Sequence, residues 1–300
     1  MTDIAEQVTW GKTAALAVVA PERCVLEVKG GDRLSWLNGL LTCDLATRQP
    51  GDVVHGLAVA QKGKIVTDAV VVVDAERVLL VVQRATVDTL VASFEHHLMM
   101  EDAELARSDS AVVFLHGPRA LEVLGSAREA GGVGGPFDLT GNGGAIVVAS
   151  NPAIVEAIRS AAVRVGGGEG DEAGWDALRV RSSVARFGVD FDETTYPQEA
   201  ALETKAVSFQ KGCYLGQEVV CMLEMRGHVK RKLVTLAIDG GVTPAPRAIV
   251  TDAAGAAVGE VTSLSRLPGD ACTAALAMVK YAFIASGTEL RVDGQRAVVG

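Results

Sequence analysis

From residue 233 onward the chain alternates between short apolar runs and turns, and this pattern constrains the fold more than any other feature. Five segments that each contain glycine separate six runs: 233–238, 248–251, 257–264, 273–279, 289–292 and 297–299. Short runs rich in β-branched residues are typical of strands. Such strands protect their edges when the sheet closes on itself. The sequence therefore predicts a small antiparallel β-barrel, and a division into domains at 1–230 and 231–300.

Before this boundary, candidate strands and candidate helices are mixed. The β-branched runs 25–28, 53–60, 65–73, 78–83, 112–115 and 145–149 favour strands, and helices are expected at 32–41, 86–100, 118–130, 152–162 and 173–186. Asp32 is expected to cap the first of these helices. The order of elements predicts an α+β fold built from split β-α-β layers, and not a doubly wound parallel sheet.

Composition and charge exclude several classes of protein. A net charge of −9 is opposite to the basic bias of a general nucleic-acid surface. The five cysteines, at 24, 43, 213, 221 and 272, lack the spacing of a zinc or iron–sulfur site, so no metal is expected. An odd, scattered set of cysteines suits a reducing compartment. The apolar run 14–20 ends at Pro21 and is too short for a membrane span, so a cytoplasmic location without membrane contact is expected.

The segment from Lys211 to Glu218 has the character of a site. Its sequence, Lys-Gly-Cys-Tyr-Leu-Gly-Gln-Glu, combines a thiol, a cation, an amide and a carboxylate with two glycines. Lys211 lies two residues from Cys213, and a helix that begins at Gln217 after Gly216 would direct its positive end toward the same turn. Both effects favour a reactive thiolate. Alternatively, Cys213 is a small buried hydrophobic residue beside a tight turn.

Asp68 is a second candidate, because it interrupts an apolar strand. A buried carboxylate is costly unless it is hydrogen-bonded or functional. Asp68 follows the turn at Gly63 and is surrounded in sequence by apolar residues. The functional interpretation is a site carboxylate. The structural interpretation is a strand-end aspartate that pairs with an arginine or a backbone amide.

These motifs resemble those of a known family. The segment 197–200 (Pro-Gln-Glu-Ala), the segment 211–218, Arg226-Gly227 and the basic run 230–233 are similar to the YgfZ-type folate-binding family, which is related to the aminomethyltransferase (T-protein) of the glycine cleavage system. The segments 30–44 and 61–68 also resemble this family. The resemblance implies an aminomethyltransferase-like folate-binding fold: two ferredoxin-like lobes and the C-terminal barrel around a folate-sized cavity.

The resemblance also implies a function and a set of site residues. The expected function is a folate-binding accessory protein that supports the assembly or repair of iron–sulfur enzymes, some of them linked to tRNA modification. Its cofactor would be tetrahydrofolate or a one-carbon derivative, and its partners iron–sulfur client enzymes or assembly proteins. The implied catalytic residues are Cys213, Lys211 and Asp68, and the implied cofactor-binding residues are Asp68, Tyr196, Gln217, Glu218 and Arg226.

Three positions depart from the patterns of these families and keep two alternatives open. Thr67 replaces one of two adjacent acids of the T-protein, and Arg181 replaces its acidic folate anchor. Met222 stands where the YgfZ-type family usually has an arginine shortly after the Gln-Glu of its signature, which is the segment 211–218 here. One alternative is a tetrahydrofolate-dependent aminomethyltransferase of the glycine-cleavage type. The other is a non-catalytic scaffold of the same fold.

Overall fold

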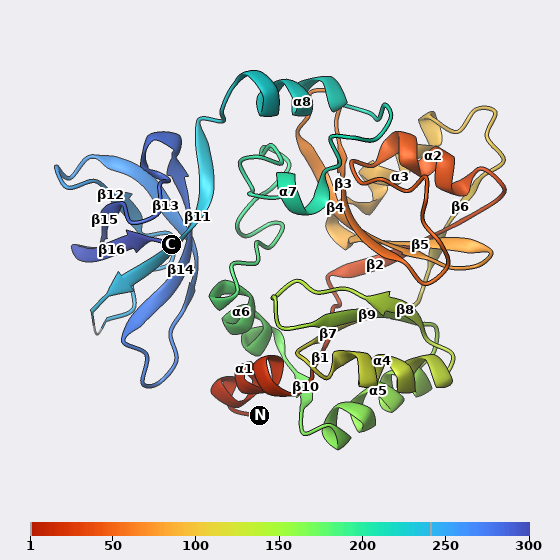
Figure 1. Cartoon of the computed structure of the whole chain (residues 1–300), viewed down its shortest axis with the longest axis horizontal. Coiled ribbons are helices and arrows are strands. Elements are labelled where there is room, and N and C mark those ends of the chain that lie inside the picture. Colours follow the sequence, from red (N-terminus) through yellow and green to blue (C-terminus); the bar gives the residue numbers. More distant parts are fainter. Residues whose placement is uncertain (1, 241) are drawn as a thin grey trace.

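The computed structural model describes residues 2–240 and 242–300, without the side chain of Arg226. It contains two five-stranded sheets and a closed barrel (Figure 1). The predicted α+β class, with its two lobes and C-terminal antiparallel barrel, is confirmed. Among the described residues, no helix is both long and apolar enough to cross a membrane.

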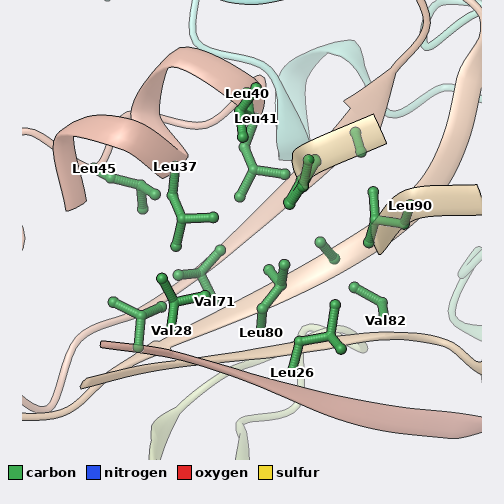
Figure 2. Close-up of a cluster of buried hydrophobic side chains, with 14 of the residues drawn as sticks. Leu26, Val28, Leu37, Leu40, Leu41, Leu45, Val71, Leu80, Val82 and Leu90 are labelled. Carbon is green, nitrogen blue, oxygen red and sulfur yellow. The ribbon is translucent and has the colours of Figure 1, made fainter. Parts of the chain in front are cut away.

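The first sheet is fully antiparallel. Its strands are, in order across the sheet, β3 (Val53–Val59), β4 (Ile65–Val73), β5 (Arg77–Gln83), β2 (Arg23–Lys29) and β6 (Glu104–Ser108). The helices α2 (Arg33–Leu40) and α3 (Val87–His96) cover one face of it, and a 3-10 turn, η1 (Arg84–Thr86), precedes α3. Figure 2 shows how leucines of α2 and of the segment after it pack on aliphatic side chains of the strands; the labelled residues are Leu26, Val28, Leu37, Leu40, Leu41, Leu45, Val71, Leu80, Val82 and Leu90.

The second sheet has the order β10 (Gly168–Gly170), β1 (Leu16–Val19), β7 (Ala111–His116), β9 (Gly144–Ala149) and β8 (Val133–Pro136). Only β1 and β10 pair in parallel among these neighbours. The helices α4 (Ala120–Glu129) and α5 (Pro152–Arg164) cover its outer face with a core of alanine, valine and isoleucine. The N-terminal helix α1 (Ile4–Thr13) packs beside α6 (Glu172–Arg181), near the end of this lobe (Figure 1).

The inner faces of the two sheets pack against each other. Alternate residues of a strand point to the same face. One alternating set on each inner strand therefore fills the space between the sheets with side chains from both lobes: Val25, Val70, Val72, Leu79, Val81, Val112, Phe114, Ile146 and Val148. This shared core fixes the position of one lobe against the other.

The C-terminal barrel begins at Arg231. Its strands are, in order around the barrel, β11 (Arg231–Asp239), β14 (Cys272–Lys280), β13 (Ala257–Ser265), β12 (Ile249–Thr251), β15 (Glu289–Val292) and β16 (Gln295–Val299), and β16 pairs with β11 to close it. Each of the six expected runs overlaps one of these strands. A 3-10 turn, η2 (Tyr281–Phe283), follows β14, and the helices α7 (Glu203–Ala206) and α8 (Gln217–Arg226) lie in the stretch before the barrel. Whether the chain folds as separate units on either side of residue 231 stays a prediction.

Several predicted boundaries are wrong. The helix expected at 86–100 ends at His96, and Met99 and Met100 are exposed in the following loop. The helix expected at 173–186 ends at Arg181, because Ser183 adopts a left-handed conformation with φ of 58°. Asp32 precedes α2 but does not cap it; its carboxylate accepts the backbone N–H of Asp102 at 2.9 Å.

Candidate functional site

The apolar interface between the two sheets becomes polar at one end. Three inward-facing rows each finish with a polar side chain where they leave the shared core: Val72-Val70-Asp68 on β4, Leu79-Val81-Gln83 on β5 and Val112-Phe114-His116 on β7. Arg23 ends the corresponding row on β2, and His55 lies on β3 beside Val53. All five polar residues line a cavity of about 640 Å³. This volume is within the usual range of small-molecule sites.

Asp68 is held by two neighbours on adjacent strands. Its Oδ2 accepts a hydrogen bond from Nη2 of Arg23 at 2.7 Å, and its Oδ1 accepts one from Nε2 of Gln83 at 2.8 Å. Burial opposes ionisation of the carboxyl, but the charge and hydrogen bond of Arg23, with smaller contributions from His55 and Gln83, together hold the pKa of Asp68 below its ordinary value. The structural interpretation of Asp68 is therefore correct about its arginine partner. The same carboxylate also faces the cavity.

Two histidines line the same cavity, and neither was among the expected site residues. Burial lowers the pKa of His116 to about 3 and that of His55 to about 4, so both imidazoles are neutral near pH 7. His116 stacks on Trp175 of α6 with 4.3 Å between ring centroids. The sequence pattern that could have identified His116 is the alternation along its strand. In Val112-x-Phe114-x-His116, two core residues are followed on the same face by a polar residue, which indicates the rim of the shared core.

The remaining cavity walls come from irregular segments and from two helices. Trp175 and Arg179 of α6 and Lys205 of α7 contribute, together with residues 182, 184–186 and 137–141. The last of these segments is held by Asp138, whose carboxylate accepts the backbone N–H groups of residues 140, 141 and 143. The cavity walls therefore combine apolar and aromatic surfaces with polar groups, which come from the strand ends and also from helices, as with Arg179 and Lys205.

The signature segment, residues 211–218, lies against α2 and not along the cavity. The Lys211 ammonium donates to the backbone carbonyls of Asn38, Leu41 and Cys43 at 2.6, 2.8 and 2.6 Å. The backbone N–H of Leu215 donates to Gly39, also in α2. Lys211 thus satisfies backbone carbonyls at the C-terminal end of a helix about 170 residues earlier in the chain, because the last carbonyls of a helix lack partners within it. The expected pairing of its charge with the Cys213 thiol is not seen in these contacts.

The other signature residues occupy the start of α8. As expected, Gly216 precedes a helix that begins at Gln217, and its φ of 77° is left-handed. Gln217 accepts the backbone N–H of Tyr214 at 3.3 Å, whereas Cys213 and Glu218 are exposed. The side chain of Arg226 lies outside the described residues. None of the residues 211–218 lines the 640 Å³ cavity.

Tyr196 and the Pro-Gln-Glu-Ala segment (197–200) contact Lys64, α8 and the barrel. The Lys64 ammonium lies 3.5 Å from the centroid of the Tyr196 ring. Gln198 donates to the carbonyl of Val220 in α8, and the carbonyl of Glu199 accepts the N–H of Leu233 in the barrel. Of the seven expected site residues, the structure therefore places only Asp68 in the cavity wall; the six others either lie elsewhere or, for Arg226, have no described side chain.

The three departures from the family patterns also have definite places. Thr67 is buried, and its hydroxyl accepts the backbone N–H of Gln83. Arg181 forms a two-pronged ion pair with Asp270 of the barrel, at 2.6 and 2.9 Å, and does not line the cavity. Met222 is exposed on α8. Within the part of the chain that the structure describes, no group of His, Cys, Asp and Glu side chains is placed to hold a metal ion.

Comparisons with known proteins agree with this architecture. Residues 22–131 match the GCVT N-terminal domain family. The aminomethyltransferase of Moorella thermoacetica is 30% identical over 294 residues, which cover 89% of this chain and 79% of that protein. The tRNA-modifying protein YgfZ of Vibrio vulnificus is 25% identical over 277 residues, covering 86% and 78%. The crystal structure of glycine cleavage system aminomethyltransferase T from Bartonella henselae matches 99% of this chain and 88% of that chain, with a TM-score of 0.84 and 20% identity. The chain therefore belongs to the GCVT family, the family that includes the aminomethyltransferases.

Proposed function

We propose that this protein binds tetrahydrofolate, or a one-carbon derivative of it, in the cavity between the two lobes. The observation that carries the proposal is the cavity itself: about 640 Å³, with aromatic walls and a polar end formed by Arg23, Asp68 and Gln83. A flat heterocycle suits the aromatic and aliphatic walls, and its polar edge suits the strand ends. Lys205 and Arg48 also line the cavity and offer positive charge to the carboxylate tail of a folate.

We further propose an accessory role in the assembly or repair of iron–sulfur enzymes, of the kind that the YgfZ resemblance implies. The Lys-Gly-Cys-Tyr-Leu-Gly-Gln-Glu motif supports this role, as does the similarity to tRNA-modifying protein YgfZ of Vibrio vulnificus. Cys213 is exposed outside the cavity, so its thiol is accessible to a macromolecular partner. In this arrangement the folate and the thiol act from separate places on the protein.

An aminomethyltransferase is the second candidate, because several relatives with comparable identity carry that name. The site favours it less. Thr67 occupies the place of one of two adjacent T-protein acids, and both oxygens of Asp68 are already engaged by Arg23 and Gln83. A carboxylate held in an ion pair is a weak base, because its partner stabilises the charged form. Folate-dependent methylene transfer from an aminomethyl donor would support the transferase instead.

Calorimetric titration of tetrahydrofolate into the protein tests the binding proposal. Thr140 lines the cavity, so Thr140→Trp should fill it and abolish binding. Asn142 belongs to the same loop but does not line the cavity, and Asn142→Trp is the matched control, expected to bind as the unaltered protein does. Absence of heat and of a thermal shift with the unaltered protein would contradict the proposal and favour a scaffold.

The accessory role is tested in cells that lack the homologous gene. The unaltered chain should restore the activity of an iron–sulfur enzyme that carries out tRNA modification, whereas Cys213→Ala should not. Cys272→Ala is the control, because Cys272 lies in the barrel, away from the signature segment. Full restoration by Cys213→Ala would remove the proposed role of the thiol, and failure of the unaltered chain would remove the accessory role.

A further inference from the structure

His116 carries two buried polar atoms without a partner. The residue is 1% exposed, and neither Nδ1 nor Nε2 has a hydrogen-bond partner among the described residues. An unsatisfied buried polar group destabilises the folded state, and native proteins rarely retain one without a purpose. His116 also lines the cavity, so a ligand bound there would lie against this residue.

The position of the imidazole is fixed from several sides. Its ring is nearly parallel to that of Trp175, at 4.3 Å between centroids and 6°, and to that of Phe114, at 6.2 Å and 7°. On the backbone, His116 pairs with Leu16 of β1 and with Gly144 of β9, at the end of the central strand of the second sheet. Because Trp175 covers a face of the ring, polar recognition is left to the edge of the ring, which carries both nitrogens.

The charge state of the ring sets the kind of partner. Burial lowers the pKa of His116 to about 3, with Asp138 opposing the shift, so the ring is neutral at physiological pH. A neutral imidazole has one N–H donor and one acceptor nitrogen. Its complement is an uncharged group that either accepts from the N–H or donates to the other nitrogen, as found on a heterocycle that contains amide and amine groups.

We propose that His116 is a specificity-determining residue of the cavity, whose imidazole edge hydrogen-bonds the uncharged heterocycle of the ligand. The proposal rests on the proposed function, in which that heterocycle is the pterin of tetrahydrofolate. Asp68 with its partners Arg23 and Gln83 forms the polar end of the first sheet, and His116 is the corresponding group on the second sheet. The ligand is then recognised from both lobes, which explains why the cavity lies at their junction.

His116→Phe tests the proposal, because phenylalanine keeps a stacking ring and removes both nitrogens. Titration with tetrahydrofolate at pH 7.5 should show at least a tenfold loss of affinity. The ligand-free variant should melt at the same temperature as the unaltered protein or higher, because it no longer buries two unpartnered polar atoms. His228→Phe is the matched control: His228 stacks on Tyr281 with 4.4 Å between centroids, outside the cavity, and the variant should bind normally.

The possible outcomes separate this inference from the proposed function. Unchanged affinity in His116→Phe overturns the inference and leaves folate binding intact. Weak binding together with a large fall in melting temperature also overturns it, because His116 would then serve the fold. Absence of binding to the unaltered protein overturns both. As a second measurement, ¹⁵N spectra of histidine-labelled unaltered protein should show tetrahydrofolate shifting the His116 nitrogens; spectra without this shift overturn the inference.

Discussion

Arg179 of α6 and Asp190 form a buried ion pair with 2.7 Å between Nη1 and Oδ2, and their side chains are 2% and 0% exposed. The guanidinium also donates to Ser263 of β13 at 2.9 Å, and Asp190 accepts the hydroxyls of Thr262 and Ser263. The pair therefore joins the helix that forms one cavity wall to the barrel. Arg181, with Asp270, makes a second connection between the same two elements.

Arg179→Met should strongly destabilise the protein, because it leaves the Asp190 carboxylate buried without its cation. Breaking a buried pair by removing one partner costs about 3–5 kcal/mol. Arg159→Met is the control, because Arg159 pairs with Glu156 and Glu169 on the surface and should contribute below about 1 kcal/mol. Urea denaturation followed by circular dichroism measures both variants. Similar midpoints for the two would show that the Arg179 network does not hold helix and barrel together.

Gly216→Ala should distort the start of α8. A Cβ atom at Gly216 would lie 2.4 Å from the carbonyl oxygen of Ala60, and the φ of 77° disfavours any residue with a side chain. The backbone term alone costs about 1–2 kcal/mol, and the contact adds to it. Gly212→Ala is the matched control in the same loop, because a Cβ there meets nothing within 4 Å. Thermal unfolding should show a clearly lower melting temperature for Gly216→Ala and little change for Gly212→Ala. Equal melting temperatures of the two variants would contradict this geometry.

Much of the fold could be predicted because local pattern and tertiary environment agree. The strand β4 is a β-branched run, and the six barrel strands are short, mainly apolar runs separated by turn residues, so composition and spacing identify them. The short strands β8 and β10 could not be predicted in this way. They consist of Val-Gly-Gly-Pro and Gly-Glu-Gly, and they are strands only because β9 and β1 pair with them. Their structure depends on tertiary contacts.

Only a site residue whose polarity differs from that of its neighbours in sequence could be predicted. Asp68 was identified because it is a carboxylate in an apolar strand, and the structure places it in the cavity. The other expected site residues whose side chains the structure describes lie outside the cavity wall, because proximity in sequence does not show which way a loop packs. Lys211 and Cys213 are two residues apart, yet their surroundings differ. The Lys211 ammonium donates to the backbone carbonyls of Asn38 in α2 and of Cys43 after it, whereas Cys213 is exposed.

Lys211→Met should loosen the signature segment from α2. The ammonium group satisfies three carbonyls, whereas a methionine side chain satisfies none of them. Hydrogen exchange followed by mass spectrometry should show faster exchange in peptides covering 208–216 and 38–45, with the barrel unchanged. Lys62→Met, at an exposed position in the nearby turn, is the control and should leave exchange unaltered. Unchanged protection in Lys211→Met would show that the segment is held by other contacts, such as the burial of Tyr214.

His116 should also make the stability of the protein depend on pH. In the unfolded chain an imidazole takes up a proton below about pH 6.5, whereas burial lowers the folded pKa of His116 to about 3. Between these values the unfolded state binds more protons, so stability falls as the pH decreases, by about 1.4 kcal/mol per pH unit for this group. His116→Phe removes this dependence. Relative to the unaltered protein, the variant should gain about 2 kcal/mol between pH 7.5 and pH 5, measured by urea denaturation across that range. Parallel curves for the two proteins would mean that His116 takes up a proton without unfolding, through water that reaches its ring nitrogens.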